Sequence, residues 1–236
     1  MLIDMHTHSS GISGCCQLDA YEIVDAAKKT GLDGIILTNH YHSEGHLDYA
    51  SEADYVENYI KEYDEARAYG EKVGLKVFFG VEITAEFMER IHLLAYGVGE
   101  DFLRENPEIY NLSQKEIYER VHQYGGILVE AHPFRHNCPI LDTRYLDALE
   151  INCHPIYKTT HYEDVKTGAL KGGVMLTCGS DYHGDTEYRP LCGVYFPEDV
   201  KTIDHITQYI KTTSQIKLRV HEVNGISEDR VYELSE

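Results

Sequence analysis

Two histidines one residue apart, His6 and His8, lie near the start of the chain in the segment DMHTHSS. The apolar residues Leu2 and Ile3 precede them, so the segment reads as a short buried strand that runs out into a loop. Side chains alternate between the two faces of a strand, which points both imidazoles in the same direction. In one interpretation the pair is half of a metal site, and in the other it is two solvent-facing loop histidines.

Further acidic and histidine side chains fall at or near the ends of other apolar segments. They are His40 after GIILTN, Glu82 after VFFGV, His92 at the start of IHLLAY, His132 after ILVEA, Glu150 within ALEIN, and Asp181 and His183 after VMLTCGS. In barrel enzymes the carboxyl ends of the strands meet on one face, where catalytic groups gather. This clustering predicts a site with more than one metal ion. His92 lies early in its segment, so its strand must run antiparallel or the sheet must bend inward there.

The expected ligands are imidazole nitrogens and carboxylate oxygens. Such a set suits Zn, Mn or Fe and disfavours Ca, which prefers oxygen ligands. Glu82 could bridge two ions through its two oxygens. Paired ions about 3.5–4 Å apart generate a hydroxide nucleophile and hold a phosphoryl group, so a phosphate ester is the substrate that fits such a site.

The elements that must position these residues alternate between strand and helix. We expect strands over residues 2–5, 34–38, 77–81, 91–96, 127–131, 148–151, 174–178 and 193–196, and helices over 19–29, 53–73, from 113 to the pair Gly125-Gly126, over 160–170 and after 199. Apolar strands separated by helices predict a parallel sheet covered on both faces, and seven or eight such units predict a closed α/β barrel in a single domain. We place this barrel in residues 1–200, with a C-terminal helix and an edge segment in 201–236 packing on it.

Composition limits the classes of function. The chain of 236 residues is 42% apolar, enough for a sizeable core, and its formal charge of −19 argues against a broad basic face for long nucleic acid. We find no apolar run long enough to cross a membrane, and Asp4 and His6 interrupt the start where a signal peptide would be apolar. We therefore expect a cytoplasmic protein whose six cysteines are thiols, and composition leaves the oligomeric state open.

The segments DMHTH, LTNH, GVEIT, IHLLAY, EAHPFR and GSDYHG occur in the order typical of the PHP (polymerase and histidinol phosphatase) family. The chain resembles this family from residue 2 to about residue 197. The resemblance implies a distorted (β/α)7 TIM-like barrel that carries two or three divalent ions, Zn, Mn or Fe, at the carboxyl end of its strands. It also implies metal-dependent hydrolysis of phosphate esters.

The resemblance assigns the metal ligands position by position. It places one ion at His6, His8, Glu82 and Asp181, a second at Glu82, His92 and His132, and a third at His40 and His183. In many members the third ion takes an Asp or His shortly after the first motif, where this chain has SSGISGCC. Ser13, Cys15 and Cys16 are the candidates there, and a thiolate could bind Zn or Fe. We favour the alternative that the cysteines are small buried residues under the loop.

The resemblance also suggests how to interpret Asn39 and Arg135. Asn39 stands where the family usually has Asp before His40, which puts in doubt the group that would orient His40. Arg135 follows His132-Pro133, and its guanidinium could grip two oxygens of a substrate phosphate. The alternative for Arg135 is a salt bridge to a nearby carboxylate.

We assign Arg135, Asp181 and His183 to the catalytic residues. Other histidines near these motifs could contact substrate or donate a proton to the leaving group, and the default for each is a loop residue without a role. These histidines are His42, His46, His136 and His154. We expect Tyr182 to pack against the site.

These observations predict a metal-dependent phosphatase or phosphodiesterase that uses a metal-bound hydroxide on a small phosphorylated metabolite or nucleotide. We expect no long nucleic acid and no membrane as partners. One alternative is an amidohydrolase, although Glu82 would then stand where many of those enzymes use a modified lysine. A nuclease for short oligonucleotides and a non-catalytic protein with structural metals are the others.

Overall fold

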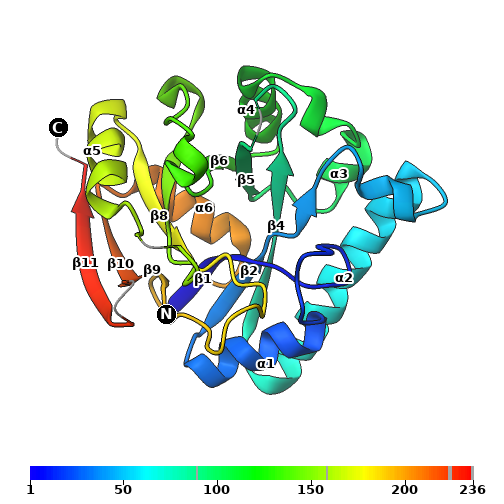
Figure 1. Cartoon of the computed structure of the whole chain (residues 1–236), viewed down its shortest axis with the longest axis horizontal. Helices are drawn as coiled ribbons and strands as arrows, with labels where there is room; N and C mark the ends of the chain where they lie inside the picture. The colour runs from blue at the N-terminus through cyan, green and yellow to red at the C-terminus, as the bar shows by residue number, and fades with distance from the viewer. Residues whose placement is uncertain (89, 158, 223–224, 235–236) are drawn as a thin grey trace.

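In the computed structural model, residues 1–88, 90–157, 159–222 and 225–234 are described. Over these residues eleven strands form a sheet in the order β11-β10-β9-β1-β2-β4-β5-β6-β7-β8, with β3 added beside β4 (Figure 1). The strands are β1 (Leu2–Thr7), β2 (Gly34–Leu37), β3 (His40–Tyr41), β4 (Lys76–Thr84), β5 (His92–Tyr96), β6 (Ile127–Glu130), β7 (Ala148–Asn152), β8 (Met175–Gly179), β9 (Gly193–Tyr195), β10 (Gln215–His221) and β11 (Ser227–Glu233). The sheet curls into a nearly closed barrel in one domain, which confirms the predicted fold class.

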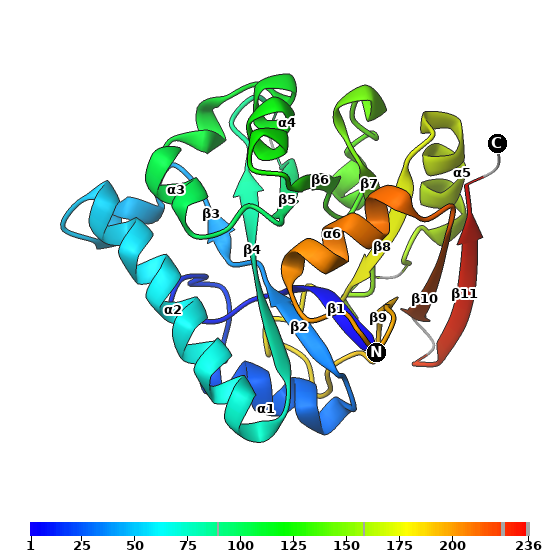
Figure 2. The ribbon, with the colours of Figure 1, turned by 180° about the vertical axis from the view of Figure 1, so that it is seen from behind.

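The helices lie outside the sheet (Figures 1 and 2). They are α1 (Ala20–Thr30), α2 (Glu52–Val73), α3 (Asp101–Glu105), α4 (Gln114–Gln123), α5 (Tyr162–Gly172) and α6 (Ile203–Thr212), with short 3-10 helices η1 (Gly45–Asp48), η2 (Ile109–Asn111), η3 (Arg135–Asn137) and η4 (Thr143–Tyr145). Seen from behind, α6 lies in front of the strands. No helix in the described ranges is both long and apolar enough to span a membrane.

Local signals explain where the main helices begin. The Asp19 carboxylate accepts the backbone N–H groups of Tyr21 and Glu22, while the Glu22 carboxylate accepts that of Asp19, so α1 opens on a capping box. Ser113 and Glu116 form the same box at α4. This helix ends at Gln123, slightly before the predicted glycine pair.

Strand direction explains the position of His92. The pairs β1–β2, β2–β4, β6–β7 and β7–β8 are parallel, whereas β5 is antiparallel to both β4 and β6. The start of β5 therefore lies at the same end of the barrel as the carboxyl ends of the parallel strands. This confirms one of the two arrangements predicted for His92.

The barrel closes where β1 meets the segment after β8. Thr7 and Tyr182 form an isolated parallel bridge, and the backbone N–H of Asp181 donates to the carbonyl of His6 at 2.8 Å. On its other side β1 pairs with β9, and β10 pairs with β9 in turn. The predicted C-terminal edge segment thus contains two strands, β10, which is an inner strand, and β11, which is the edge. Residues 223–224 and 235–236 of the C-terminal segment lie outside the described residues, and the division at residue 200 stays a prediction.

Glu130, at the end of β6, is a buried carboxyl outside the candidate site. It is 1% exposed, its Oε2 accepts the Leu141 backbone N–H at 2.9 Å, and its Oε1 has no hydrogen-bond partner among the described residues. Burial raises the pKa of Glu130 to about 8.

The raised pKa of Glu130 predicts that the stability of the folded chain falls as pH rises. The folded chain keeps a proton on Glu130 that the unfolded chain releases near its ordinary pKa, so stability is full below about pH 4.5 and is lost as pH rises to about 8. We expect Glu130→Gln to match the wild type near pH 5 and to be more stable by a few kcal/mol near pH 8.5, because each pH unit between the unfolded and folded pKa values is worth about 1.4 kcal/mol. Urea unfolding at both pH values measures this. Equal stability differences at the two pH values would contradict it.

Candidate metal centre

The residues predicted to bind metal lie together at the carboxyl end of the barrel. The set consists of His6, His8, His40, Glu82, His92, His132, Asp181 and His183. They come from the end of β1, from β3 and β4, from the start of β5, and from the segments just after β6 and β8. Ligand atoms of His6, His8, Glu82 and Asp181 lie within 4.8 Å of one another, and these four residues are buried. Metal binding by this set is a prediction that the arrangement supports.

The Glu82 carboxylate lies at the middle of the cluster and is fully buried. Its Oε1 is 2.9 Å from His92 Nδ1 and 3.3 Å from His132 Nε2. The same oxygen is 3.3 Å from His6 Nε2. These distances suit ligands that share an ion, since two ligands about 2.1 Å from a metal at a tetrahedral angle are roughly 3.4 Å apart.

The second oxygen of Glu82 faces another group of imidazoles. Its Oε2 lies 2.7 Å from His40 Nδ1 and 3.4 Å from His8 Nε2. A carboxylate whose two oxygens face different imidazoles has the arrangement of a bridge between two ions. The grouping differs from the predicted one in that His6 faces the same oxygen as His92 and His132, and bridging by Glu82 stays a prediction.

Hydrogen bonds set which nitrogens of the first histidines carry protons. His6 Nδ1 lies 2.8 Å from Glu150 Oε1, a carboxylate that can only accept, so this nitrogen carries the hydrogen. His6 Nε2 faces Glu82 and Asp181, and it has no hydrogen-bond partner among the described residues. Burial opposes a charge on this ring, but the carboxylates of Glu150 and Glu82 hold the pKa of His6 well above its usual value, so without a metal this nitrogen keeps a proton whose place a bound cation would take.

His8 follows the same pattern through a hydroxyl. Ser13 donates from its Oγ to Asn39 Oδ1 at 2.9 Å, so His8 Nδ1, 3.2 Å from that Oγ, is the donor to it. His8 Nε2 is left as a lone pair 3.0 Å from Asp181 Oδ1. The Nε2 atoms of both predicted histidines therefore face carboxylates, and this set of nitrogen and oxygen atoms fits a divalent metal.

The carboxylates of Glu82 and Asp181 carry negative charge in the site. Burial would raise the pKa of Glu82, but the imidazoles of His40 and His6 hold it well below its usual range. Burial likewise opposes the charge of Asp181, yet Arg135 and then His6 hold its pKa well below the usual value. Both carboxyls are ionised at neutral pH, as metal ligands must be.

Two imidazoles are held in the neutral form. Burial, followed by the neighbouring rings of His183 and His40, lowers the pKa of His8 well below its ordinary value. Burial and the charge of Arg135 lower the pKa of His132 to about 4. A neutral imidazole offers the lone pair that a metal ion requires.

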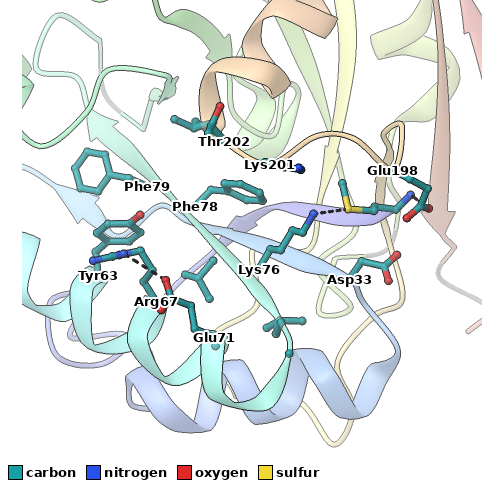
Figure 3. A pocket seen from close by; sticks show the side chains of 16 residues that line it. Asp33, Tyr63, Arg67, Glu71, Lys76, Phe78, Phe79, Glu198, Lys201 and Thr202 are labelled. Carbon is teal, nitrogen blue, oxygen red and sulfur yellow. Dashed lines mark hydrogen bonds and ion pairs between the residues drawn. The ribbon is translucent and has the colours of Figure 1, made fainter.

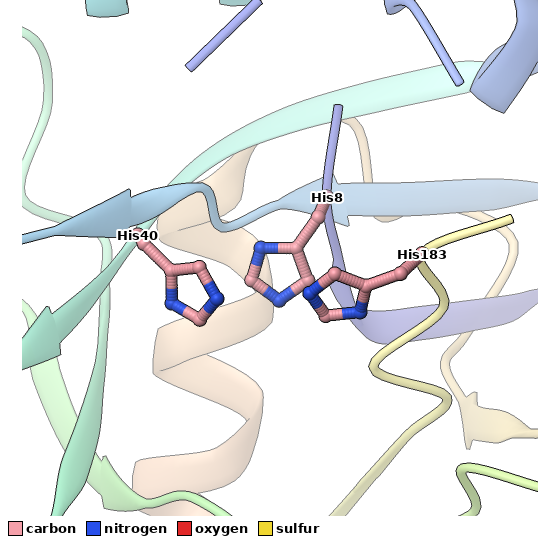
Figure 4. Close-up of side chains that lie close together, drawn as sticks. All are labelled: His8, His40 and His183. Atoms are coloured by element: carbon pink, nitrogen blue, oxygen red, sulfur yellow. The ribbon is translucent and has the colours of Figure 1, made fainter. Parts of the chain in front are cut away.

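A third group consists of His8, His40 and His183, whose rings face one another from three separate segments (Figure 4). The His8 ring lies 4.5 Å from that of His40 and 4.2 Å from that of His183, centroid to centroid. His183 Nδ1 is 2.7 Å from the backbone carbonyl of Asp181, so it donates there and leaves Nε2 as a lone pair. The group matches the pair predicted for a third ion, with His8 shared between sites.

Two of the ligands have an unusual backbone. The φ angles of His132 and Asp181 are 35° and 51°, in the left-handed region that non-glycine residues seldom adopt. Each residue comes two positions after the end of a strand, and each backbone N–H is held, by Glu150 Oε2 at 2.9 Å and by the His6 carbonyl at 2.8 Å. Such conformations cluster at functional sites, where surrounding contacts maintain them.

A family model decides the classification. The model described as the PHP domain matches residues 4–171, a range that includes every predicted ligand except Asp181 and His183 in the segment after β8. This chain belongs to the PHP family. Membership of this family classes it as a metal-dependent phosphoesterase, a hydrolase.

Similar proteins agree with the fold. An uncharacterized protein of Methanocaldococcus jannaschii, MJ1587, is 26% identical over 175 residues, covering 70% of this chain and 86% of its own. A two-domain protein from Bacteroides vulgatus, described as containing a predicted PHP-like metal-dependent phosphoesterase, superposes with a TM-score of 0.69 and 19% identity over 94% of this chain and 65% of its own length. The lesion-specific endonuclease EndoQ of Pyrococcus furiosus gives a TM-score of 0.62 and 18% identity, over 92% of this chain and 57% of its own.

Asn39, the departure from the usual PHP motif, acts on a different histidine than expected. Its Oδ1 accepts the Ser9 backbone N–H at 2.7 Å and the Ser13 hydroxyl at 2.9 Å. The Ser13 hydroxyl in turn accepts from His8 Nδ1 and from the His40 backbone N–H, at 3.2 and 3.0 Å. Asn39 therefore orients His8 through Ser13, while the His40 ring is placed against Glu82.

The side chains of the adjacent residues Cys15 and Cys16 lie in different surroundings. Cys16 is 6% exposed, and its thiol donates to the His8 carbonyl at 3.3 Å, as expected of a small buried residue. Cys15 is exposed and lines the cavity beside His40 and His183. The prediction of a buried pair is wrong for Cys15, because the loop turns the two side chains in different directions.

Arg135 forms a salt bridge, which was the alternative interpretation given to it. Its Nη2 donates to Asp181 Oδ2 at 2.6 Å and to Asn152 Oδ1 at 2.8 Å, and the guanidinium lies 4.2 Å from the centre of the Tyr157 ring. The salt bridge is to a residue of the site itself, and Arg135 lines the same cavity of about 370 Å³ as His132. Its role in phosphate binding stays a prediction.

Sequence reasoning noted Glu150 without giving it a role, and it missed Asn152. Glu150 orients His6 and caps the His132 backbone, and Asn152 positions both Arg135 and Glu150. The two residues are two positions apart on β7, so strand alternation already places them on one face. Of the four loop histidines, His136 and His154 line the cavity, and His42 and His46 are not among its lining residues.

A larger cavity lies at the opposite end of the barrel (Figure 3). Its volume is about 740 Å³, and Lys76, Phe78 and Phe79 of β4 line it together with the start of α6. The Lys76 ammonium is already bonded to the Val200 carbonyl at 2.8 Å. The residues described as lining it include no histidine or cysteine, so this cavity does not offer the metal ligands of the other end.

Proposed function

We propose that this PHP-family hydrolase cleaves phosphate esters of small molecules, a phosphorylated metabolite or a nucleotide, with two or three divalent ions of Zn, Mn or Fe. The observation that carries the proposal is the Glu82 carboxylate, whose two oxygens face separate groups of imidazoles beside a cavity lined by Arg135. When bound, such ions activate water and stabilise negative charge on a phosphoryl group.

The residues of this chain supply binding and orientation. In the proposal Arg135 turns one of its remaining N–H groups to a phosphate oxygen while Asp181 and Asn152 hold its Nη2. Tyr157 stacks on the guanidinium and fixes its plane. Asp181 and His183 complete the proposed catalytic set: His183 Nδ1 donates to the Asp181 carbonyl, and Asp181 Oδ1 lies 3.0 Å from His8 Nε2.

The size of the cavity and the charge favour a small substrate. A volume of about 370 Å³ fits a small phosphorylated molecule, and a formal charge of −19 opposes a long nucleic acid. Many amidohydrolases carry a modified lysine at the metal site, and the described residues that line this cavity include no lysine. We propose a cytoplasmic enzyme without a membrane partner.

Removal and return of metal test the proposal. A chromogenic aryl phosphate, a nucleotide monoester and a diester are assayed with protein as purified, after chelation, and after loading with Zn, Mn or Fe. We expect turnover to disappear on chelation and to return with at least one metal. Inactivity with every metal on every ester would overturn the proposal, and binding to long duplex DNA that weakens steeply with salt would favour the nuclease.

Arg135→Lys tests the phosphate-binding residue. Lysine keeps the charge but loses the planar fork, so we expect kcat/KM for phosphate monoesters to fall by about 10–100-fold, the value of one to two kcal/mol or more of charged hydrogen bonding. Steady-state kinetics measure it at unchanged metal content.

The matched control is Arg144→Lys, since Arg144 is an exposed arginine paired with Asp142 on the surface. It should leave kcat/KM unchanged. If Arg135→Lys also has wild-type kinetics, Arg135 does not bind the phosphate.

A further inference from the structure

Three cysteines outside the candidate metal centre lie together where β7 and β8 approach β9 and β10 (Figure 1). Cys178 lies on β8, Cys153 directly follows β7, and Cys192 directly precedes β9. Their sulfur atoms all lie within 4.8 Å of one another, and those of Cys153 and Cys178 are 3.6 Å apart. The three side chains are free thiols and are at most 3% exposed.

The spacing of these sulfurs is that of ligands that share one ion. Two sulfurs that each lie 2.3 Å from a zinc ion at a tetrahedral angle are about 3.8 Å apart. Buried cysteines can also pack as small apolar side chains, and such packing brings sulfur atoms to a similar distance. A neighbouring polar group separates the two cases.

This group is the imidazole of His221, on β10, which has a buried lone pair. Ser227 donates its hydroxyl hydrogen to the Leu191 carbonyl at 2.9 Å, so His221 Nδ1, 2.8 Å from that hydroxyl oxygen, is the donor to it. Burial lowers the pKa of His221, which keeps the ring neutral at pH 7 and leaves Nε2 as a lone pair. His221 is only 7% exposed, and Nε2 has no hydrogen-bond partner among the described residues.

His221 borders the cysteines through its backbone and through a small cavity. Its backbone N–H donates to Cys153 Sγ at 3.3 Å, and the two residues line one cavity of about 10 Å³. A cavity of this size has room for about one water molecule. A cation held by the sulfurs would supply the partner that Nε2 lacks, either directly or through one water bound to the ion.

We propose that Cys153, Cys178 and Cys192 bind a divalent cation that prefers sulfur, and that this cation is zinc. Three buried thiolates are typical ligands of structural zinc, and the cavity beside His221 leaves room for a fourth. On binding, three thiol protons pass to solvent and three metal–sulfur bonds form, with no change of oxidation state. The hydrogen bond that the Cys178 thiol donates to the Arg219 carbonyl at 3.2 Å is then lost.

This ion would join the barrel to the strands that follow it. Cys153 and Cys178 belong to the neighbouring strands β7 and β8, whereas Cys192 begins β9, which pairs with β10. None of the three cysteines is among the described residues that line the cavity of the candidate metal centre. The zinc site is therefore structural, and it does not depend on the proposed hydrolysis.

Cobalt(II) loading of the full chain tests the proposal, because a thiolate ligand adds a charge-transfer band in the near ultraviolet that nitrogen and oxygen ligands do not give. Wild type and Cys178→Ala are loaded, and their spectra and bound metal are measured. We expect Cys178→Ala to lose most of the band and about one equivalent of metal. Alanine is small and apolar, so it would be tolerated if the cysteines served only for packing.

The matched controls are Cys138→Ala and Cys15→Ala, since neither cysteine belongs to the group of three. Both variants should keep the band and the metal. An unchanged band in Cys178→Ala, a wild type that binds cobalt without a band, or loss of the band in Cys15→Ala would overturn the proposal.

X-ray absorption at the zinc edge covers the case in which Cys178→Ala fails to fold. It is measured on zinc-loaded wild type and on Cys15→Ala, both of which keep all three cysteines. We expect sulfur atoms at about 2.3 Å from zinc in both proteins, beside nitrogen and oxygen atoms at about 2.0–2.2 Å. Bound zinc without sulfur neighbours would overturn the proposal, and metal-dependent hydrolysis by the same sample would leave the proposed function standing.

Discussion

Replacing Glu82 by glutamine should remove most of the bound metal and lower kcat/KM by at least about 10³-fold, roughly 4 kcal/mol of barrier. The side chain is fully buried, and both of its oxygens face imidazoles. An amide keeps the shape but loses the charge and replaces one oxygen by an N–H donor that cannot bind a cation. Metal analysis and steady-state kinetics on one phosphate ester measure both effects.

Glu119→Gln is the control for this substitution, because Glu119 is an exposed glutamate on α4 that pairs with Lys115 on the same helix. It should change neither metal content nor rate. A Glu82→Gln protein that binds the wild-type amount of metal and turns over at the wild-type rate would remove the basis of the bridging role.

Arg189→Met should destabilise the folded chain by about 3–5 kcal/mol, the range measured when one partner of a buried ion pair is removed. The Arg189 guanidinium lies 2.6 Å from Asp4 Oδ2, and the two side chains are 2% and 0% exposed. Asp4 also accepts the backbone N–H groups of Ser180 and His6, so its carboxylate ties β1 to the segment after β8. Urea unfolding measures the loss.

The stability lost in Arg189→Met should depend on pH and on whether Asp4 is still present to carry a buried charge. Burial raises the pKa of Asp4 even against the charge of Arg189, so in Arg189→Met the carboxyl takes up a proton readily and the loss is smaller near pH 5 than near pH 8. The double variant Asp4→Asn/Arg189→Met should recover much of the stability, because no charge is left buried.

Arg144→Met, at a surface pair with Asp142, should leave the stability of the folded chain nearly unchanged, because water and salt screen an exposed pair. If it cost as much as Arg189→Met, burial would not be the cause. Equal losses in the single and double variants would show that packing, and not the ion pair, is responsible.

Much of the fold could be predicted because its strands are apolar throughout and its helices begin at capping residues such as Asp19 and Ser113. The parts that could not be predicted lack those signals. The two-residue strand β3 is too short for a pattern, and β11, with the sequence SEDRVYE, is largely polar. The direction of β5 depends on its neighbours, which its own residues do not specify.

The same distinction applies to the site. The clustering of the candidate ligands could be predicted because most of them lie at or just after a strand end, and the family resemblance supplied their assignment to ions. The roles of Glu150, Asn152 and Asn39 depend on hydrogen bonds between segments far apart in the chain. Cys15 and Cys16 are adjacent, and only the folded loop shows which of them faces the histidines.

The closure between β1 and the segment after β8 has a mechanical consequence. Backbone contact there is limited, among the residues described, to the Thr7–Tyr182 bridge and a few single hydrogen bonds, yet His6 and His8 lie on one side of it and Asp181 on the other. An ion bound by these residues would cross-link the two edges of the sheet. Separation of the edges would then require release of the ion, so we expect local unfolding of the metal-depleted protein to begin here. Free energies of unfolding can therefore be compared only between samples of equal metal saturation.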